Sequence, residues 1–117
     1  MVFIESRLFA RQLKAQPGDA EMEVLSAIQQ DLLKNPGIGV VIPGLGGVRK
    51  ARAANPHRRK GKRGGSRYFY YYFEHRGRIY LLYLLDKDER DDLSDEDRAL
   101  LRSLAGAAIR DEEVSNG

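Results

Sequence analysis

The sequence contains no cysteine and only two histidines, His57 and His75. The absence of cysteine excludes disulfide bonds, thiolate catalysis and cysteine-based zinc sites. Because the two histidines are not spaced as ligands on a shared element, we expect no metal site and interpret both as exposed loop residues. We also expect no cofactor, since the glycines at 44–47 are not followed by the Gly-Lys-Ser/Thr of a phosphate-binding loop.

Long hydrophobic runs are also missing. The longest candidate, around residues 79–85, has the length of a strand and is far shorter than a membrane-spanning helix. Residues 1–5 do not place a basic segment before an apolar stretch, so no signal peptide is expected. These features predict a cytoplasmic protein that does not interact with membranes.

Acidic residues are absent between Lys34 and Glu74. Within this stretch, residues 49–67 carry nine of the 20 lysines and arginines, whereas residues 86–97 carry eight of the 17 acidic residues. The net charge of +3 therefore conceals a strongly basic block. Such a block inside a folded domain indicates a polyanionic partner, most commonly nucleic acid, and the alternative is a solvated basic loop.

The first half of the chain predicts a strand followed by two helices. Residues 2–5 are typical of a short strand, and Ser6 is a candidate cap for a helix that ends near Pro17 and Gly18. Asp19 is a candidate cap for the second helix, which ends at residues 35–37. The residues predicted to recur on its apolar face are Met22, Leu25, Ile28 and Leu32.

The second half predicts three strands and a final helix. The strands are expected at about 47–53, 67–74 and 79–87, with a turn at Arg76-Gly77 between the last two. Ser94 and Asp97 form a capping-box pattern that begins the helix. The predicted fold class is α+β, an antiparallel sheet with an N-terminal helical hairpin and a C-terminal helix. One domain is expected over residues 1–110, followed by a polar, disordered tail at 111–117.

The strand at 67–74 is almost entirely aromatic. Strand alternation places Arg67, Phe69, Tyr71 and Phe73 on one face, and one of the two faces must be core. If the face of Arg67 points outward, it offers a guanidinium group and a phenol beside the basic block. Phosphate binding and base stacking need such groups, so Arg67 and Tyr71 are predicted to be exposed, while four of the six aromatic residues are expected to be core.

Three segments resemble the HigB-like branch of the RelE toxin superfamily. Residues 41–52 resemble its V-I-x-G-x-G-G-L-R-K-x-R segment, and residues 61–67 with the tyrosines that follow resemble its G-K-R-G-G-x-R-x-x-Y-Y segment. Residues 79–93 resemble its x-Y-L-L…K-N-E-x-x-D-L segment, although Asp86 and Asp88 replace the usual Gly and Asn. The resemblance covers roughly residues 3–105.

This resemblance implies a compact RelE-like domain that cleaves mRNA on the ribosome without a metal ion and thereby inhibits translation. It implies attack of a 2′-hydroxyl group on the adjacent phosphate, which requires a base, cations for the transition state and an acid. The partners implied are mRNA, the ribosome and a neutralising antitoxin of the HigA-like, helix-turn-helix kind, through which alone operator DNA would be bound.

The candidate catalytic residues share a location in or near the basic block. Arg67 is expected to bind phosphate, Tyr71 to stack on a base, and the crowded lysines to act as a base or as cations; the set is Arg67, Lys60, Lys62, Arg63, Tyr71 and Lys87. Other basic residues are expected to contact RNA or the ribosome: Arg49, Lys50, Arg52, Arg58 and Arg59.

Three alternatives stay open at this point. A ParE-like relative would share the fold but inhibit DNA gyrase, although the basic segment at 61–67 favours the RNA-cleaving branch. A basic RNA- or DNA-binding module without catalysis would explain the charge but not the match along the later strands. A degenerate toxin that only binds its antitoxin is suggested by the negative charge of Asp86.

Overall fold

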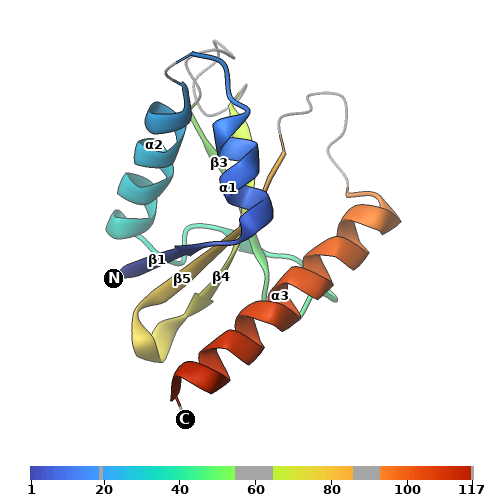
Figure 1. Ribbon diagram of the computed structural model, residues 1–117. Coiled ribbons are helices and arrows are strands. Elements are labelled where there is room, and N and C mark those ends of the chain that lie inside the picture. Colours follow the sequence, from blue (N-terminus) through green and yellow to red (C-terminus); the bar gives the residue numbers. More distant parts are fainter. Residues whose placement is uncertain (19, 55–64, 86–92, 117) are drawn as a thin grey trace.

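The computed structural model describes residues 1–18, 20–54, 65–85 and 93–116 (Figure 1). In chain order the elements are β1 (Val2–Glu5), α1 (Arg7–Lys14), α2 (Ala20–Lys34), β2 (Val40–Val41), β3 (Arg49–Ala53), β4 (Ser66–Phe73), a 3-10 turn (Glu74–Arg76), β5 (Arg78–Leu85) and α3 (Asp95–Asn116). No helix in these ranges combines the length and the apolar character needed to cross a lipid bilayer.

The strands form one sheet in the order β1-β5-β4-β3-β2. Neighbours are antiparallel except β1 and β5, which run parallel. This arrangement confirms the predicted α+β class and places β5 inside the sheet, between β1 and β4. The sequence analysis missed β2, a two-residue edge strand, and placed the start of β3 about two residues too early.

Helices cover both faces of the sheet. On one face α1 and α2 pack on a cluster that includes Tyr68 and Tyr70, and on the other α3 packs on a cluster that includes Phe69 (Figure 1). The face that begins with Arg67 therefore does not point outward over most of its length, since Phe69 is buried and Tyr71 and Phe73 pack against the α3 cluster.

Side chains from α1 complete the edge of β5 where β1 ends. β1 pairs with β5 only as far as Leu81. Beyond that point, the Ser6 hydroxyl donates to the carbonyl oxygen of Leu82 at 2.8 Å. The Gln12 amide then donates to the carbonyl oxygen of Leu84 at 2.7 Å and accepts from the Leu84 N–H at 2.8 Å. These bonds satisfy backbone groups that an edge strand would otherwise leave open.

The predicted caps at Ser6 and Ser94 are present. The Ser6 hydroxyl accepts from the Phe9 N–H at 3.0 Å, and the Ser94 hydroxyl accepts from the Asp97 N–H at 3.0 Å while the Asp97 carboxylate accepts from the Ser94 N–H at 3.2 Å. The candidate cap Asp19 lies outside the described residues. The α2 core face also differs from the predicted one, because Met22 is exposed and Val24 is buried.

The C-terminal helix includes residues 111–116, where the sequence analysis expected a disordered tail. Glu112 is buried in this segment and accepts hydrogen bonds from Arg76 at 3.0 Å and Arg78 at 3.3 Å. The Tyr80 hydroxyl lies between the Glu112 and Asp111 carboxylates. These contacts join the end of α3 to the turn before β5.

Loss of the hydroxyl group is expected to change stability differently at Tyr68 and Tyr70, two stacked tyrosines of β4. The Tyr70 hydroxyl accepts from the Gly39 N–H and donates to the carbonyl oxygen of Pro36, both at 2.8 Å. The buried Tyr68 hydroxyl has no hydrogen-bond partner within the described ranges. Tyr70→Phe should therefore lower the free energy of unfolding by about 1–3 kcal/mol, whereas Tyr68→Phe should leave it unchanged or raise it. Urea unfolding of both variants checks this, and equal losses would contradict it.

Stability is expected to fall at alkaline pH. Burial raises the pKa of Tyr68, Tyr70 and Tyr80, and hydrogen bonds to Asp111 and Glu112 raise the pKa of Tyr80 further. A folded-state pKa above the unfolded value gives stability that is fully present below about pH 10 and is lost as the pH rises through the folded pKa. Urea midpoints measured from neutral to strongly alkaline pH should drop above about pH 10, and less steeply in Tyr80→Phe. A flat profile would refute the assignment.

Candidate functional site

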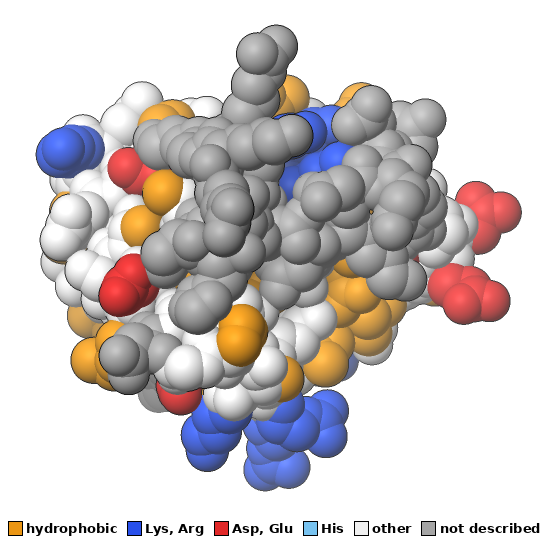
Figure 2. Space-filling model, turned by 90° about the horizontal axis from the view of Figure 1, so that it is seen from above, with side chains coloured by type: hydrophobic (Ala, Val, Ile, Leu, Met, Phe, Trp, Pro, Cys, Tyr) orange, Lys and Arg blue, Asp and Glu red, His pale blue; other side chains and the backbone are white. Residues whose placement is uncertain are grey.

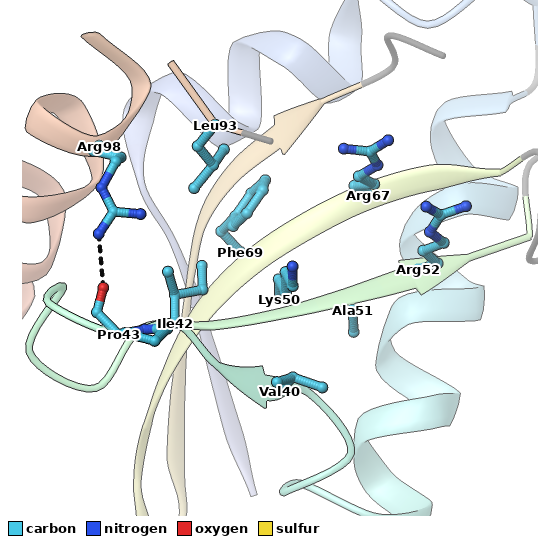
Figure 3. A pocket seen from close by; sticks show the side chains of 10 residues that line it. All are labelled: Val40, Ile42, Pro43, Lys50, Ala51, Arg52, Arg67, Phe69, Leu93 and Arg98. Atoms are coloured by element: carbon cyan, nitrogen blue, oxygen red, sulfur yellow. Dashed lines mark hydrogen bonds between the residues drawn. The ribbon is translucent and has the colours of Figure 1, made fainter. Parts of the chain in front are cut away.

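A pocket of about 740 Å³ opens on the α3 face of the sheet (Figure 3). One part of its lining is cationic and comes from Lys50, Arg52, Arg67 and Arg98. The other part is mainly apolar, with side chains from β2, the turn after it, β4 and the start of α3: Val40, Ile42, Pro43, Phe69 and Leu93. A pocket with these two parts can hold an anionic group beside a flat apolar one.

Strand pairing explains how the cations converge. Arg52 of β3 lies opposite Arg67 of β4, and Lys50 lies opposite Phe69. Because side chains alternate along a strand, these four residues share one face, while Ala51 packs with the cluster on the other face. Figure 3 shows the Lys50, Arg52 and Arg67 side chains on the same side of the two strands. Lys50 and Arg52 are exposed and Arg67 is half-buried.

The apolar wall depends on the glycine-rich turn between β2 and β3. Its backbone closes through a 2.9 Å hydrogen bond from the Ile42 N–H to the carbonyl oxygen of Val48. Gly47 has a positive φ of 111°, which favours glycine, and a Cβ atom there would lie 3.1 Å from the Tyr71 ring. Arg98 of α3 donates to the carbonyl oxygen of Pro43 at 2.7 Å, which ties this turn to the helix (Figure 3).

Two predicted site residues lie outside the pocket lining. Arg49 donates to the carbonyl oxygens of Gly39 at 2.8 Å and Gly37 at 3.4 Å, so part of its guanidinium group holds the segment before β2. Tyr71 is half-buried, and its ring centroid lies 4.6 Å from that of Phe73 within the α3 cluster. The exposed position expected for Tyr71 is wrong, because α3 covers this part of the strand.

Of the predicted site residues, the pocket brings together Lys50, Arg52 and Arg67. Arg58, Arg59, Lys60, Lys62, Arg63 and Lys87 lie outside the described residues, as do Asp86 and Asp88. The sequence analysis did not assign Phe69, Leu93 or Arg98 to the site. The capping box at Ser94 offered one usable clue, since it places Arg98 in the first turns of α3.

The chemistry available in the pocket is that of cations and one exchangeable proton. Arginine stays protonated, so Arg52, Arg67 and Arg98 can bind phosphate oxygens but cannot act as a base. Among the described lining residues, only Lys50 can give up and regain a proton. No group of three or more metal-ligating side chains occurs in the part of the chain that the structure describes. Figure 2 shows Lys and Arg side chains at several separate places on the face that is seen from above.

Comparison with known proteins establishes the fold. No family model matches the chain. The solved structure of a double arginine-to-alanine variant of the E. coli toxin RelE in the free state is similar, with a TM-score of 0.57 and 13% sequence identity. The similarity covers 92% of this chain and 96% of the RelE chain. The chain therefore has the compact α+β fold of RelE.

Proposed function

We propose that this protein is a toxin of the RelE superfamily that cleaves mRNA on the ribosome and so inhibits translation. The observation that carries the proposal is the convergence of Lys50, Arg52 and Arg67 on one face of a RelE-like sheet, around a pocket with an apolar wall. A nucleotide presents matching chemistry, since its phosphate is anionic and its base is a flat ring.

The proposed reaction is metal-independent transfer of the phosphate within the RNA strand. The 2′-hydroxyl oxygen attacks the adjacent phosphorus, its proton passes to a base, and the bond to the 5′-oxygen breaks as that oxygen takes up a proton. The products are a cyclic phosphate and a free 5′-hydroxyl group. Negative charge grows on the phosphate oxygens during the reaction, and the Arg67 and Arg52 guanidinium groups are placed to stabilise it.

Lys50 is the described residue best suited to exchange protons in this reaction. It lies opposite Phe69 in the register of β3 and β4, two residues along the strand from Arg52. Its side chain is exposed at the pocket, so RNA bound there can reach its amino group. Lys60, Lys62, Arg63 and Lys87 stay predicted contributors on the basis of the motif resemblance, as do Arg58 and Arg59 for RNA binding.

The same motif resemblance supports the further proposal that the protein belongs to the HigB-like branch and has a neutralising partner. The expected partner is a HigA-like antitoxin with a helix-turn-helix domain, which covers or distorts the cationic surface and carries the complex to operator DNA. An antitoxin complex that leaves the pocket of Lys50 and Arg67 fully accessible would argue against direct masking.

The decisive experiment is induction of the chain in a bacterium, followed by mapping of new mRNA 5′ ends. Cuts within translated codons, absent when translation is blocked, support the proposed function. A control variant is Arg110→Ala, which removes an exposed cation of α3 that does not line the pocket. This variant should cleave mRNA like the parent protein. Intact mRNA with altered DNA supercoiling would instead indicate a gyrase inhibitor, and normal growth would indicate a protein without toxin activity.

A further inference from the structure

The helix α1 carries an exposed basic face that the pocket does not use. Arg7, Arg11 and Lys14 are all exposed and follow one another at intervals of four and three residues, so they line one side of the helix. The opposite side carries the buried residues Phe9 and Leu13. No acidic residue occurs within α1 to offset the charge. We call Arg7, Arg11 and Lys14 the basic face of α1.

Local stability accounts for only part of this charge. Within the described ranges, none of the three side chains forms an ion pair or a hydrogen bond to another side chain. Arg7 occupies the first turn of the helix, where the helix dipole disfavours a cation, whereas Arg11 and Lys14 lie in the last turn, where the dipole favours one. Three cations on adjacent turns repel one another as well. A surface that is unfavourable by itself becomes favourable when a polyanion binds to it.

The basic face of α1 is on the other side of the sheet from the pocket. α1 packs on the cluster that contains Tyr68 and Tyr70, whereas the pocket is lined by Phe69 from the opposite face. The helix is held firmly in this place by the Ser6 cap and by the two hydrogen bonds from Gln12 to Leu84. A short RNA strand in the pocket therefore leaves this face uncovered, while an RNA that surrounds the domain can reach both.

We propose that the basic face of α1 binds phosphate groups of structured ribosomal RNA and anchors the toxin while mRNA occupies the pocket. This inference rests on the proposed function. Its three cations are spaced by about one helical turn, on the order of 6 Å, which suits contact with successive phosphates of one RNA strand. Because the three cations form a row along the helix, they suit an extended RNA strand better than a compact anion, which would bind a single cation.

The test compares two double variants with equal net charge. Arg7→Gln/Arg11→Gln removes two cations of the basic face, and Lys34→Gln/Arg110→Gln removes two exposed cations elsewhere. Binding to purified 70S ribosomes is measured across a salt series, together with binding to a short single-stranded RNA. The first variant should bind ribosomes at least tenfold more weakly at low salt, with a salt slope shallower by roughly 0.7–0.9 for each lost contact. Its binding to the short RNA and its melting temperature should match those of the control.

The remaining outcomes of this experiment distinguish failure of the inference about α1 from failure of the proposed function. If the two variants bind ribosomes equally well and the parent binds them too, the inference fails and the proposed function stands. A parent chain that does not bind ribosomes overturns the proposed function, and the inference with it. Selective loss of binding to polyglutamate, with ribosome binding equal to that of the control, would assign the face to an acidic protein instead.

Discussion

Arg67→Ala is expected to reduce mRNA cleavage by on the order of 100- to 1000-fold while the protein stays folded. Arg67 lies near the start of β4, where pairing with β3 and β5 fixes its backbone, and its side chain reaches the pocket (Figure 3). Its planar guanidinium group can hold two phosphate oxygens at once as charge develops on them. Half-exposed cations add little to stability, so the melting temperature should change by only a few degrees.

The cleavage rate and the thermal stability are to be measured on the same preparation. Arg67→Lys should recover part of the rate, because it restores the charge but not the two-pronged geometry. Arg49→Ala is the matched control on the adjacent strand: it removes the hydrogen bonds to Gly37 and Gly39 and should lower stability more than the rate per folded molecule. A folded Arg67→Ala protein that cleaves at the parent rate would assign the role to another residue. An unfolded one would make Arg67 a structural residue.

Local patterns in the sequence were sufficient to predict most of the fold. Ser6 and Ser94 are followed by the residues that a helix cap requires, and both caps are present. Gly77 adopts the left-handed conformation, with φ of 60°, between two apolar strands, as the Arg76-Gly77 turn predicted. These features depend on residues that are close in the chain, so their physics is visible in a short window of sequence.

The wrong predictions concern residues whose burial is decided by packing against another part of the chain. Alternation correctly grouped Arg67 with Tyr71, but it carries no information on which part of that face α3 would cover. The buried Glu112 was likewise hidden, because its partners Arg76 and Arg78 lie more than 30 residues earlier in the chain. Met22 was assigned to the core of α2, yet the buried face consists of apolar residues at every fourth position: Ala20, Val24, Ile28 and Leu32.

Three of the four cations in the candidate site were predictable from the sequence, whereas Arg98 and the apolar wall were not. Lys50 and Arg52 share a strand face by simple alternation, and the basic composition of the region pointed to them. Val40 and Leu93 reach the pocket only because β2 adds to the sheet edge and α3 begins beside it. The capping box at Ser94 marks where α3 begins, but its position beside the sheet, like the pairing of the two-residue strand β2, is set by tertiary packing.

The proton-transfer role proposed for Lys50 gives a prediction that separates proton transfer from electrostatic attraction. Lys50→Ala should lower the single-turnover cleavage rate on ribosomes by on the order of 100-fold or more, the size typical of a lost acid or base. Lys50→Arg keeps the positive charge at the pocket but cannot release a proton, so it should be nearly as slow as Lys50→Ala. Binding of RNA at low salt should fall in Lys50→Ala and be retained in Lys50→Arg, because phosphate attraction needs only the charge. Exposure of the side chain makes both variants as stable as the parent. If Lys50→Arg cleaves at the parent rate, Lys50 supplies charge alone, and the base is a residue outside the described part of the pocket.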